Sequence, residues 1–174
     1  MGIITNYTSI IASSVLLLAC GSETNTQSDI ATTTPVQPAT VVATSTKSIT
    51  TPPIPQAGGY SNINNAQLEQ MIKKGVTLID IRREEEWKQT GIVKGSHTIT
   101  FFTQTGRINP NFMSEFTALV KPDQPVALIC RTGNRTRAAS QAITRQLGYK
   151  KVYNVTHGIK GWIEEKRAVI AYNK

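Results

Sequence analysis

The residues from Cys130 to Thr136 bring a thiol, two guanidinium groups and a glycine into one short segment. An unbroken apolar run, residues 125–129, precedes them and predicts a buried parallel strand. After them, apolar residues recur at every fourth position, which is helix spacing, and the pattern ends at Gly148. The thiol is therefore expected on a loop between the carboxyl end of a strand and the start of a helix. Open α/β sheets bind their ligands at such loops.

A loop of this kind favours a reactive sulfur anion. Its backbone N–H groups and the dipole of the following helix attract negative charge, and Arg131 and Arg135 add two fixed cations. A buried cysteine can also be a small hydrophobic residue, but packing alone does not call for two arginines and Gly133 beside it. We therefore predict that Cys130 is a catalytic nucleophile. The substrate-binding candidates are the next five residues: Arg131, Thr132, Gly133, Asn134 and Arg135.

Alternating strands and helices are predicted around this loop. Asn64 and Gln67 form a potential capping box that starts a helix ending at Gly75. The further segments are strands at 76–81, 96–101 and 151–155, and helices at 83–88, 110–121 and 158–165. The residues expected to face the core from the last two helices are Phe112, Phe116, Leu119, Ile159, Trp162 and Ile163. This alternation predicts an α/β fold with a small parallel sheet covered by helices on both faces.

The N-terminal third of the chain predicts a secreted, membrane-anchored protein. Residues 1–19 carry no charged side chain and include a short apolar stretch, which is followed by Cys20 and a glycine. This is similar to a bacterial lipoprotein signal peptide, although the first residues lack the usual lysines or arginines. Residues 20–59 would then contain the lipidated Cys20 and a disordered linker rich in Thr and Pro. The folded domain is expected at 60–174, outside the cytoplasm in the periplasm or cell envelope.

Charge and cysteine content limit the possible partners. The formal charge is +8, and because residues before Tyr60 sum to −1, the domain carries +9. No nucleic-acid motif accompanies this charge, so small anionic substrates or anionic lipid headgroups are the expected partners. Cys20 and Cys130 are the only cysteines, so acylation of Cys20 would leave Cys130 as a free thiol.

Four stretches within this domain resemble the single-domain rhodaneses. They are Asp80-Ile81-Arg82 with Glu86-Trp87; residues 91–99; Cys130 to Arg135; and Leu147-Gly148-Tyr149 through residues 152–155 to Trp162. The match covers nearly all of residues 60–167. It departs from the family pattern at Ile92, where a histidine is usual, and at His157, where a glycine is usual.

The resemblance implies a rhodanese-like fold and sulfurtransferase activity. A sulfane sulfur would pass from thiosulfate or a persulfide to a thiol or cyanide through a Cys130 persulfide, with no cofactor or metal. Arg131 and Arg135 would orient the anionic donor. Asp80 and Arg82 are expected to support the site without touching the substrate, with Glu86 completing their ion pair. The membrane would be contacted only through the lipid anchor, and the sequence leaves the oligomeric state open.

Two other functions remain open on these residues. The domain can be a non-catalytic module that binds a sulfur species or a partner protein. It can also be a phosphatase or arsenate reductase of the same fold, although a phosphatase loop of the form Cys-x5-Arg would place arginine at Thr136. His97 and Arg137 have no predicted role in the site, and Phe101 and Phe102 are expected to pack in the core rather than to wall the pocket.

Overall fold

The computed structural model describes residues 51–173. The predicted signal peptide, Cys20 and most of the predicted linker lie outside this range. Within residues 51–173, no helix has both the length and the apolar composition needed to cross a membrane.

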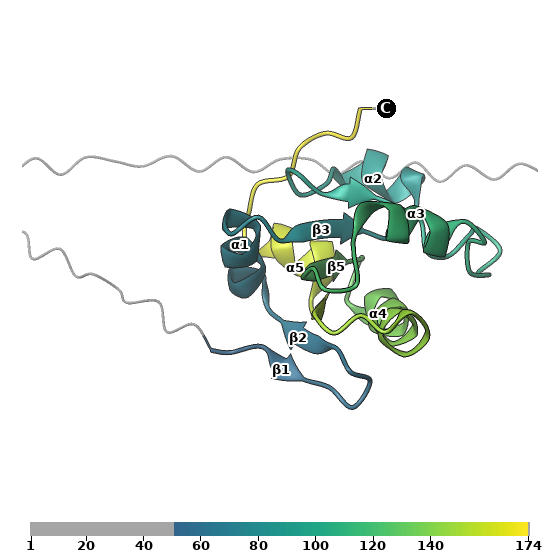
Figure 1. Ribbon diagram of the computed structural model, residues 1–174. Coiled ribbons are helices and arrows are strands. Elements are labelled where there is room, and N and C mark those ends of the chain that lie inside the picture. Colours follow the sequence, from purple (N-terminus) through teal and green to yellow (C-terminus); the bar gives the residue numbers. More distant parts are fainter. Residues whose placement is uncertain (1–50, 174) are drawn as a thin grey trace, which may run out of the picture. The chain divides into compact units, whose positions relative to one another are not determined.

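A six-stranded, mostly parallel sheet forms the centre of the domain (Figure 1). Its strands are β1 (Ile54–Pro55), β2 (Ser61–Ile63), β3 (Thr77–Asp80), β4 (His97–Thr98), β5 (Val126–Ile129) and β6 (Val152–Val155), in the order β1-β2-β6-β5-β3-β4. β2, β6, β5, β3 and β4 run parallel, and β1 pairs antiparallel with β2. The helices are α1 (Asn65–Lys73), α2 (Glu84–Thr90), α3 (Phe112–Leu119), α4 (Asn134–Leu147) and α5 (Gly158–Glu164).

Helices cover both faces of the sheet, which confirms the predicted α/β fold (Figure 1). On one face, Leu128 packs with Phe116 of α3 and Ile143 of α4. On the other, Ala127 packs with Leu68 of α1 and with residues of α5. Successive residues of β5 point to opposite faces and all are buried, as the apolar run before Cys130 predicted.

The start of the fold differs from the prediction. Neither β1 nor β2 was predicted from the sequence, and β1 lies in the stretch assigned to the linker. Both strands are very short, and the chain reverses between them in a turn at Gly59. Pro55 is tolerated because β1 is an edge strand, where a missing N–H leaves no interior ladder bond unmade.

Three further predictions are corrected by the structure. The strand expected at 96–101 is only His97–Thr98, because the following residues leave the sheet. Leu119 and Ile163 were expected in the core but are 42% and 40% exposed. Each lies at the C-terminal end of its helix, where the helix extends past the core that covers its earlier turns.

Candidate functional site

Cys130 directly follows β5 at the carboxyl edge of the sheet. Its side chain is 1% exposed, and the Gly133 N–H donates to its Sγ over 3.2 Å. In the described part of the chain this is the one backbone donor within hydrogen-bond distance of the sulfur. The loop thus supplies a polarised N–H directly to a sulfur that is shielded from water.

Two polar side chains that the sequence analysis did not select complete the surroundings of this sulfur. The Thr136 Oγ1 lies 3.5 Å from Sγ and donates to Asn154 Oδ1 over 2.6 Å. Asn154 in turn donates from Nδ2 to Asn62 Oδ1 over 2.8 Å. Both Thr136 and Asn154 are buried, so the contacts are shielded from water. Asn154 was detectable in the sequence as a single amide within an apolar strand, which requires a buried partner.

Two glycines hold the loop against the segment between β6 and α5. Gly133 has a φ of +90°, and a Cβ added there would lie 2.2 Å from the Thr156 carbonyl oxygen. Gly158 has a φ of +55°, and a Cβ there would lie 2.3 Å from the Cys130 carbonyl oxygen. The Ile159 N–H donates to that same carbonyl over 2.8 Å. Backbones therefore meet at distances that only glycine permits, which fixes the position of Cys130.

Arg135 does not present a free charge to the site. Its two terminal nitrogens donate to Glu86 Oε2 and Oε1 over 2.7 and 2.6 Å, a bidentate pair that links α4 to α2. Partial burial opposes ionisation of Glu86, but the Arg135 hydrogen bonds, the Arg83 N–H and the nearby guanidinium charges outweigh it, so the pKa of Glu86 is lowered. The pKa of Arg135 is raised, chiefly by its hydrogen bonds to Glu86. The sequence had instead predicted that Glu86 completes the ion pair of Asp80 and Arg82.

Asp80 and Arg82 form a separate, fully buried ion pair with an N···O distance of 2.7 Å. Arg82 also donates to the carbonyl oxygens of Glu86 and Gly91 and to the Thr90 hydroxyl. These contacts fasten both ends of α2 to the carboxyl end of β3. Arg82 thereby positions the backbone of Glu86, whose carboxylate holds Arg135.

Arg131 is the remaining cation of the loop. Its side chain is exposed, and no carboxylate of the described residues pairs with it. It lines a pocket of about 350 Å³ together with Glu86, Arg135 and Phe102, and a second one of about 280 Å³ between α2 and α5. Phe102 thus walls the first pocket, whereas Phe101 is in the core. Thr132 is exposed on the loop beside Arg131, and Asn134, the first residue of α4, is exposed as well.

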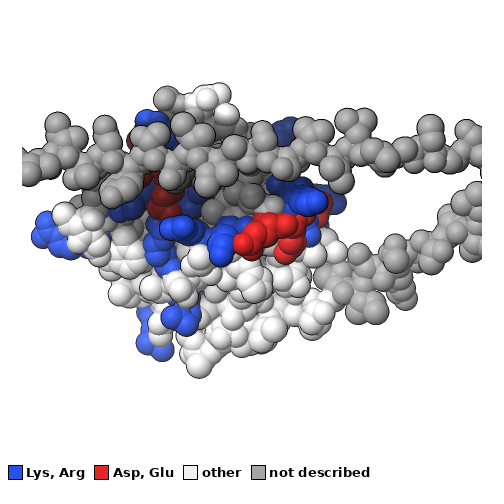
Figure 2. All heavy atoms as spheres, turned by 180° about the vertical axis from the view of Figure 1, so that it is seen from behind, with Lys and Arg blue, Asp and Glu red and all other residues white. Residues whose placement is uncertain are grey.

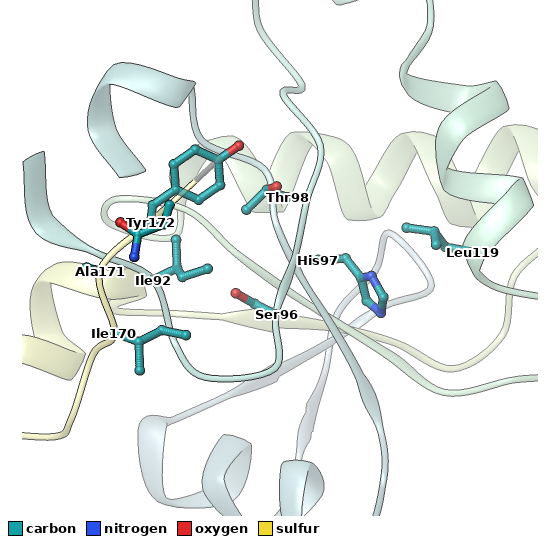
Figure 3. Close-up of a pocket in the computed structure, with 9 residues that line it drawn as sticks. Ile92, Ser96, His97, Thr98, Leu119, Ile170, Ala171 and Tyr172 are labelled. Atoms are coloured by element: carbon teal, nitrogen blue, oxygen red, sulfur yellow. The ribbon is translucent and has the colours of Figure 1, made fainter. Parts of the chain in front are cut away.

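A further hollow of about 430 Å³ lies at the β4 edge of the sheet, away from Cys130 (Figure 3). Figure 3 shows Ile92, Ile170 and Tyr172 on one side of it and His97 and Leu119 on the other. Leu119 is exposed because no element of the described chain covers this hollow. Within residues 51–173, no cluster of three or more His, Cys, Asp or Glu side chains is arranged to hold a metal ion.

Comparison with known proteins connects this geometry to a family. The sequence profile described as "Rhodanese-like domain" matches residues 64–165. An uncharacterised protein of Rickettsia prowazekii is 31% identical over 100 residues, covering 55% of this chain and 79% of its own. Thiosulfate sulfurtransferase 18 of Arabidopsis thaliana is 25% identical over 109 residues, covering 59% of this chain and 78% of its own. The crystal structure of a rhodanese-related protein of Thermoplasma volcanium superposes with a TM-score of 0.52 at 30% identity, covering 64% of this chain and 98% of that one.

Proposed function

The chain belongs to the rhodanese-like domain family, and from this premise we propose that it is a sulfurtransferase that works through a persulfide on Cys130. The observation that carries the proposal is the placement of Sγ, which is nearly dry and accepts a hydrogen bond from Gly133 N–H. An anionic sulfur in this position is both nucleophilic and protected from water. The name of the Arabidopsis relative, a thiosulfate sulfurtransferase, supports the same class of reaction.

The proposed reaction is a double displacement. The Cys130 thiolate attacks the outer sulfur of thiosulfate, the S–S bond breaks, and sulfite leaves with the bonding electron pair. A thiolate or cyanide acceptor then attacks the outer sulfur of the persulfide, and the Cys130 thiolate is released. Arg131 is the group we assign to the anionic donor, because its guanidinium is exposed and unpaired among the described residues. Arg135 holds the loop through Glu86.

Measurement of intact mass tests this reaction directly. The protein incubated with thiosulfate should gain the mass of one sulfur atom, and cyanide should remove it while thiocyanate appears. Cys130→Ser should show neither the gain nor turnover. Wild-type protein that gains no sulfur from thiosulfate or from a small persulfide would leave the non-catalytic binding module as the better reading.

A phosphatase or arsenate reductase activity is disfavoured by the position of Thr136. A Cys-x5-Arg loop would need a cation at this place, where a buried hydroxyl contacts Asn154. Phosphatase turnover that depends on Cys130 and exceeds sulfur transfer would reverse this ranking.

We also propose that the protein acts outside the cytoplasm as a lipoprotein anchored through Cys20. The support is the apolar segment at 1–19 followed by Cys20 and a glycine. Membrane fractions should contain the wild-type protein with an acylated N-terminus, and Cys20→Ser should abolish acylation. A cleaved, unacylated protein that stays in the membrane fraction would contradict the anchor.

A further inference from the structure

Lysines occupy the turns that lead from each helix back into the sheet. Such turns precede β3, β4, β5 and β6, and all their lysine side chains are exposed. The lysines are Lys73, Lys74, Lys94, Lys121, Lys150 and Lys151. Gly75, Gly95 and Gly148 lie in the same turns, and nothing lies within 4 Å of the point where each would carry a Cβ. We call the six lysines the lysine edge.

The sheet topology brings the lysine edge together on one side of the domain. β6, β5, β3 and β4 are neighbours and run parallel, so their first residues lie at the same edge. Because neighbouring strands are about 4.8 Å apart, these four strand starts span only roughly 15 Å. Figure 1 shows the carboxyl ends of β3 and β5 at the opposite edge, where Cys130 follows β5.

Few carboxylates balance the lysine edge. Glu69 pairs with Lys73, and Asp123 is the one acidic residue within these turns. At the opposite edge, Arg82, Arg83 and Arg135 are each paired with a carboxylate, whereas Arg131 has no ion pair among the described residues. Figure 2 shows, on the face it presents, red side chains in groups beside blue ones and other blue side chains that stand apart from any red one. Among the described residues, Lys73 alone of the six lysines is ion-paired, so the lysine edge carries a largely uncompensated positive charge.

The chain enters the domain alongside α1. Gln67 donates from Nε2 to the carbonyl oxygen of Thr51, the first described residue. Thr51 and Pro52 line a small hollow of about 170 Å³ that runs along α1 from Gln67 in its first turn to Lys74 just after its last. The proposed lipid anchor at Cys20 is therefore linked to the domain through residues that lie along α1, the helix that ends at Lys73.

We propose that the lysine edge is a docking surface for an anionic lipid bilayer, which holds the domain with Cys130 facing away from the membrane. Six flexible ammonium groups on short turns suit a diffuse negative surface, because each interacts as a point charge without needing a defined partner geometry. The turns expose no aromatic ring for base stacking, since Tyr149 is buried, which disfavours single-stranded nucleic acid. The orientation would leave the Cys130 loop open to soluble donors and acceptors.

Vesicle binding by the full chain tests the proposal. Cys20→Ser removes the acylation site in every sample, and vesicles of phosphatidylcholine alone measure any binding by the N-terminal segment. The expected result is stronger binding to vesicles of phosphatidylglycerol and phosphatidylcholine in equal parts. A lysine near an anionic bilayer strengthens binding roughly fivefold, so Lys121→Gln, Lys150→Gln and Lys151→Gln together should weaken it about 100-fold. Added salt should reduce the binding, because the Debye length is only about 8 Å at physiological ionic strength.

A matched triple variant at the opposite edge separates this surface from net charge. Arg107→Gln, Arg137→Gln and Lys160→Gln remove the same charge near the Cys130 loop and should change vesicle binding less than threefold. Thermal melts should show both triple variants folded. Equal losses in the two triple variants, or no preference for anionic vesicles, would overturn the proposal. Displacement of the protein from vesicles by an equal charge of DNA or of polyglutamate would also overturn it, because the surface would then prefer a nucleic acid or an acidic protein.

Discussion

Removing the charge of Arg135 should mainly lower stability, whereas removing that of Arg131 should mainly lower kcat/KM. Arg135 and Glu86 are joined by two short hydrogen bonds and are 24% and 16% exposed at their side chains. Exposed ion pairs contribute up to about 1 kcal/mol, and breaking a fully buried pair costs about 3–5 kcal/mol. For this intermediate burial we expect Arg135→Gln to lower the free energy of unfolding by about 2 kcal/mol. In a domain of this size, that lowers Tm by about 8 °C.

Arg131→Gln should instead leave Tm unchanged, because the exposed guanidinium has no partner in the described residues. If Arg131 binds the donor, kcat/KM for thiosulfate should fall about 30-fold, which corresponds to a charge-assisted contact of about 2 kcal/mol. The assay measures initial rates at varied thiosulfate concentration and a thermal melt for each variant. Arg131→Lys should keep more activity than Arg131→Gln, since it retains the charge but not the bidentate geometry.

Glu86→Gln completes the test by freeing Arg135 without removing it. The variant should lose about as much stability as Arg135→Gln, and the freed guanidinium should lower KM for thiosulfate. The pKa of Glu86 is lowered in the folded state from 4.5, so its stabilising contribution is complete above that pH and is lost as the pH falls through the lower folded value. Wild type and Glu86→Gln should therefore converge in stability in acid. Equal losses of kcat/KM in the Arg131 and Arg135 variants, with unchanged Tm in both, would refute this division of roles.

Three further substitutions test how the loop is held. Thr136→Val should lower the free energy of unfolding by about 1–3 kcal/mol, because it leaves Asn154 Oδ1 without its donor. The same variant should slow alkylation of Cys130 by iodoacetamide, since the hydroxyl near Sγ is lost. Thr136→Ser should keep both stability and alkylation rate near wild type. Gly133→Ala should lower the free energy of unfolding measured in urea by more than about 3 kcal/mol, because its Cβ would overlap the Thr156 carbonyl. Gly95→Ala is the control, and it should lower that free energy only by the left-handed backbone strain of about 1–2 kcal/mol. Asp80→Asn should lower stability by about 3–5 kcal/mol, since it leaves Arg82 charged and buried without its partner, and a urea midpoint equal to wild type would contradict the assigned role.

The features that the sequence predicted well are those set by neighbouring residues. The capping box of Asn64 and Gln67 is present with both of its hydrogen bonds, 2.7 and 2.9 Å long, because its partners are only three residues apart. Gly148 ends α4 in a left-handed conformation, as its position after the last apolar residue predicted. The apolar run before Cys130 is β5 because five consecutive apolar residues cannot leave either face of a sheet in water.

The contacts missed by the sequence analysis join distant parts of the chain. Glu86 and Arg135 are 49 residues apart, and Asn62 and Asn154 are 92 apart. No local pattern specifies which carboxylate meets which guanidinium when one segment contains three successive glutamates. The choice is made by the buried Arg82, whose hydrogen bond to the Glu86 carbonyl fixes the rotation of α2. The pairing therefore depends on the assembled fold.

The division of charge within the loop bears on which reaction it suits. The only side-chain hydroxyl within reach of Sγ, among the described residues, is that of Thr136, and Arg135 is turned outward to Glu86. A phosphoryl dianion would bring several oxygens that need cationic or N–H partners around the nucleophile. Among the described residues, the loop offers one N–H and one neutral hydroxyl at the sulfur itself, and neither is a cation. This arrangement favours sulfur transfer over phosphoryl transfer, for a reason that the count of residues between Cys130 and Arg135 alone does not supply.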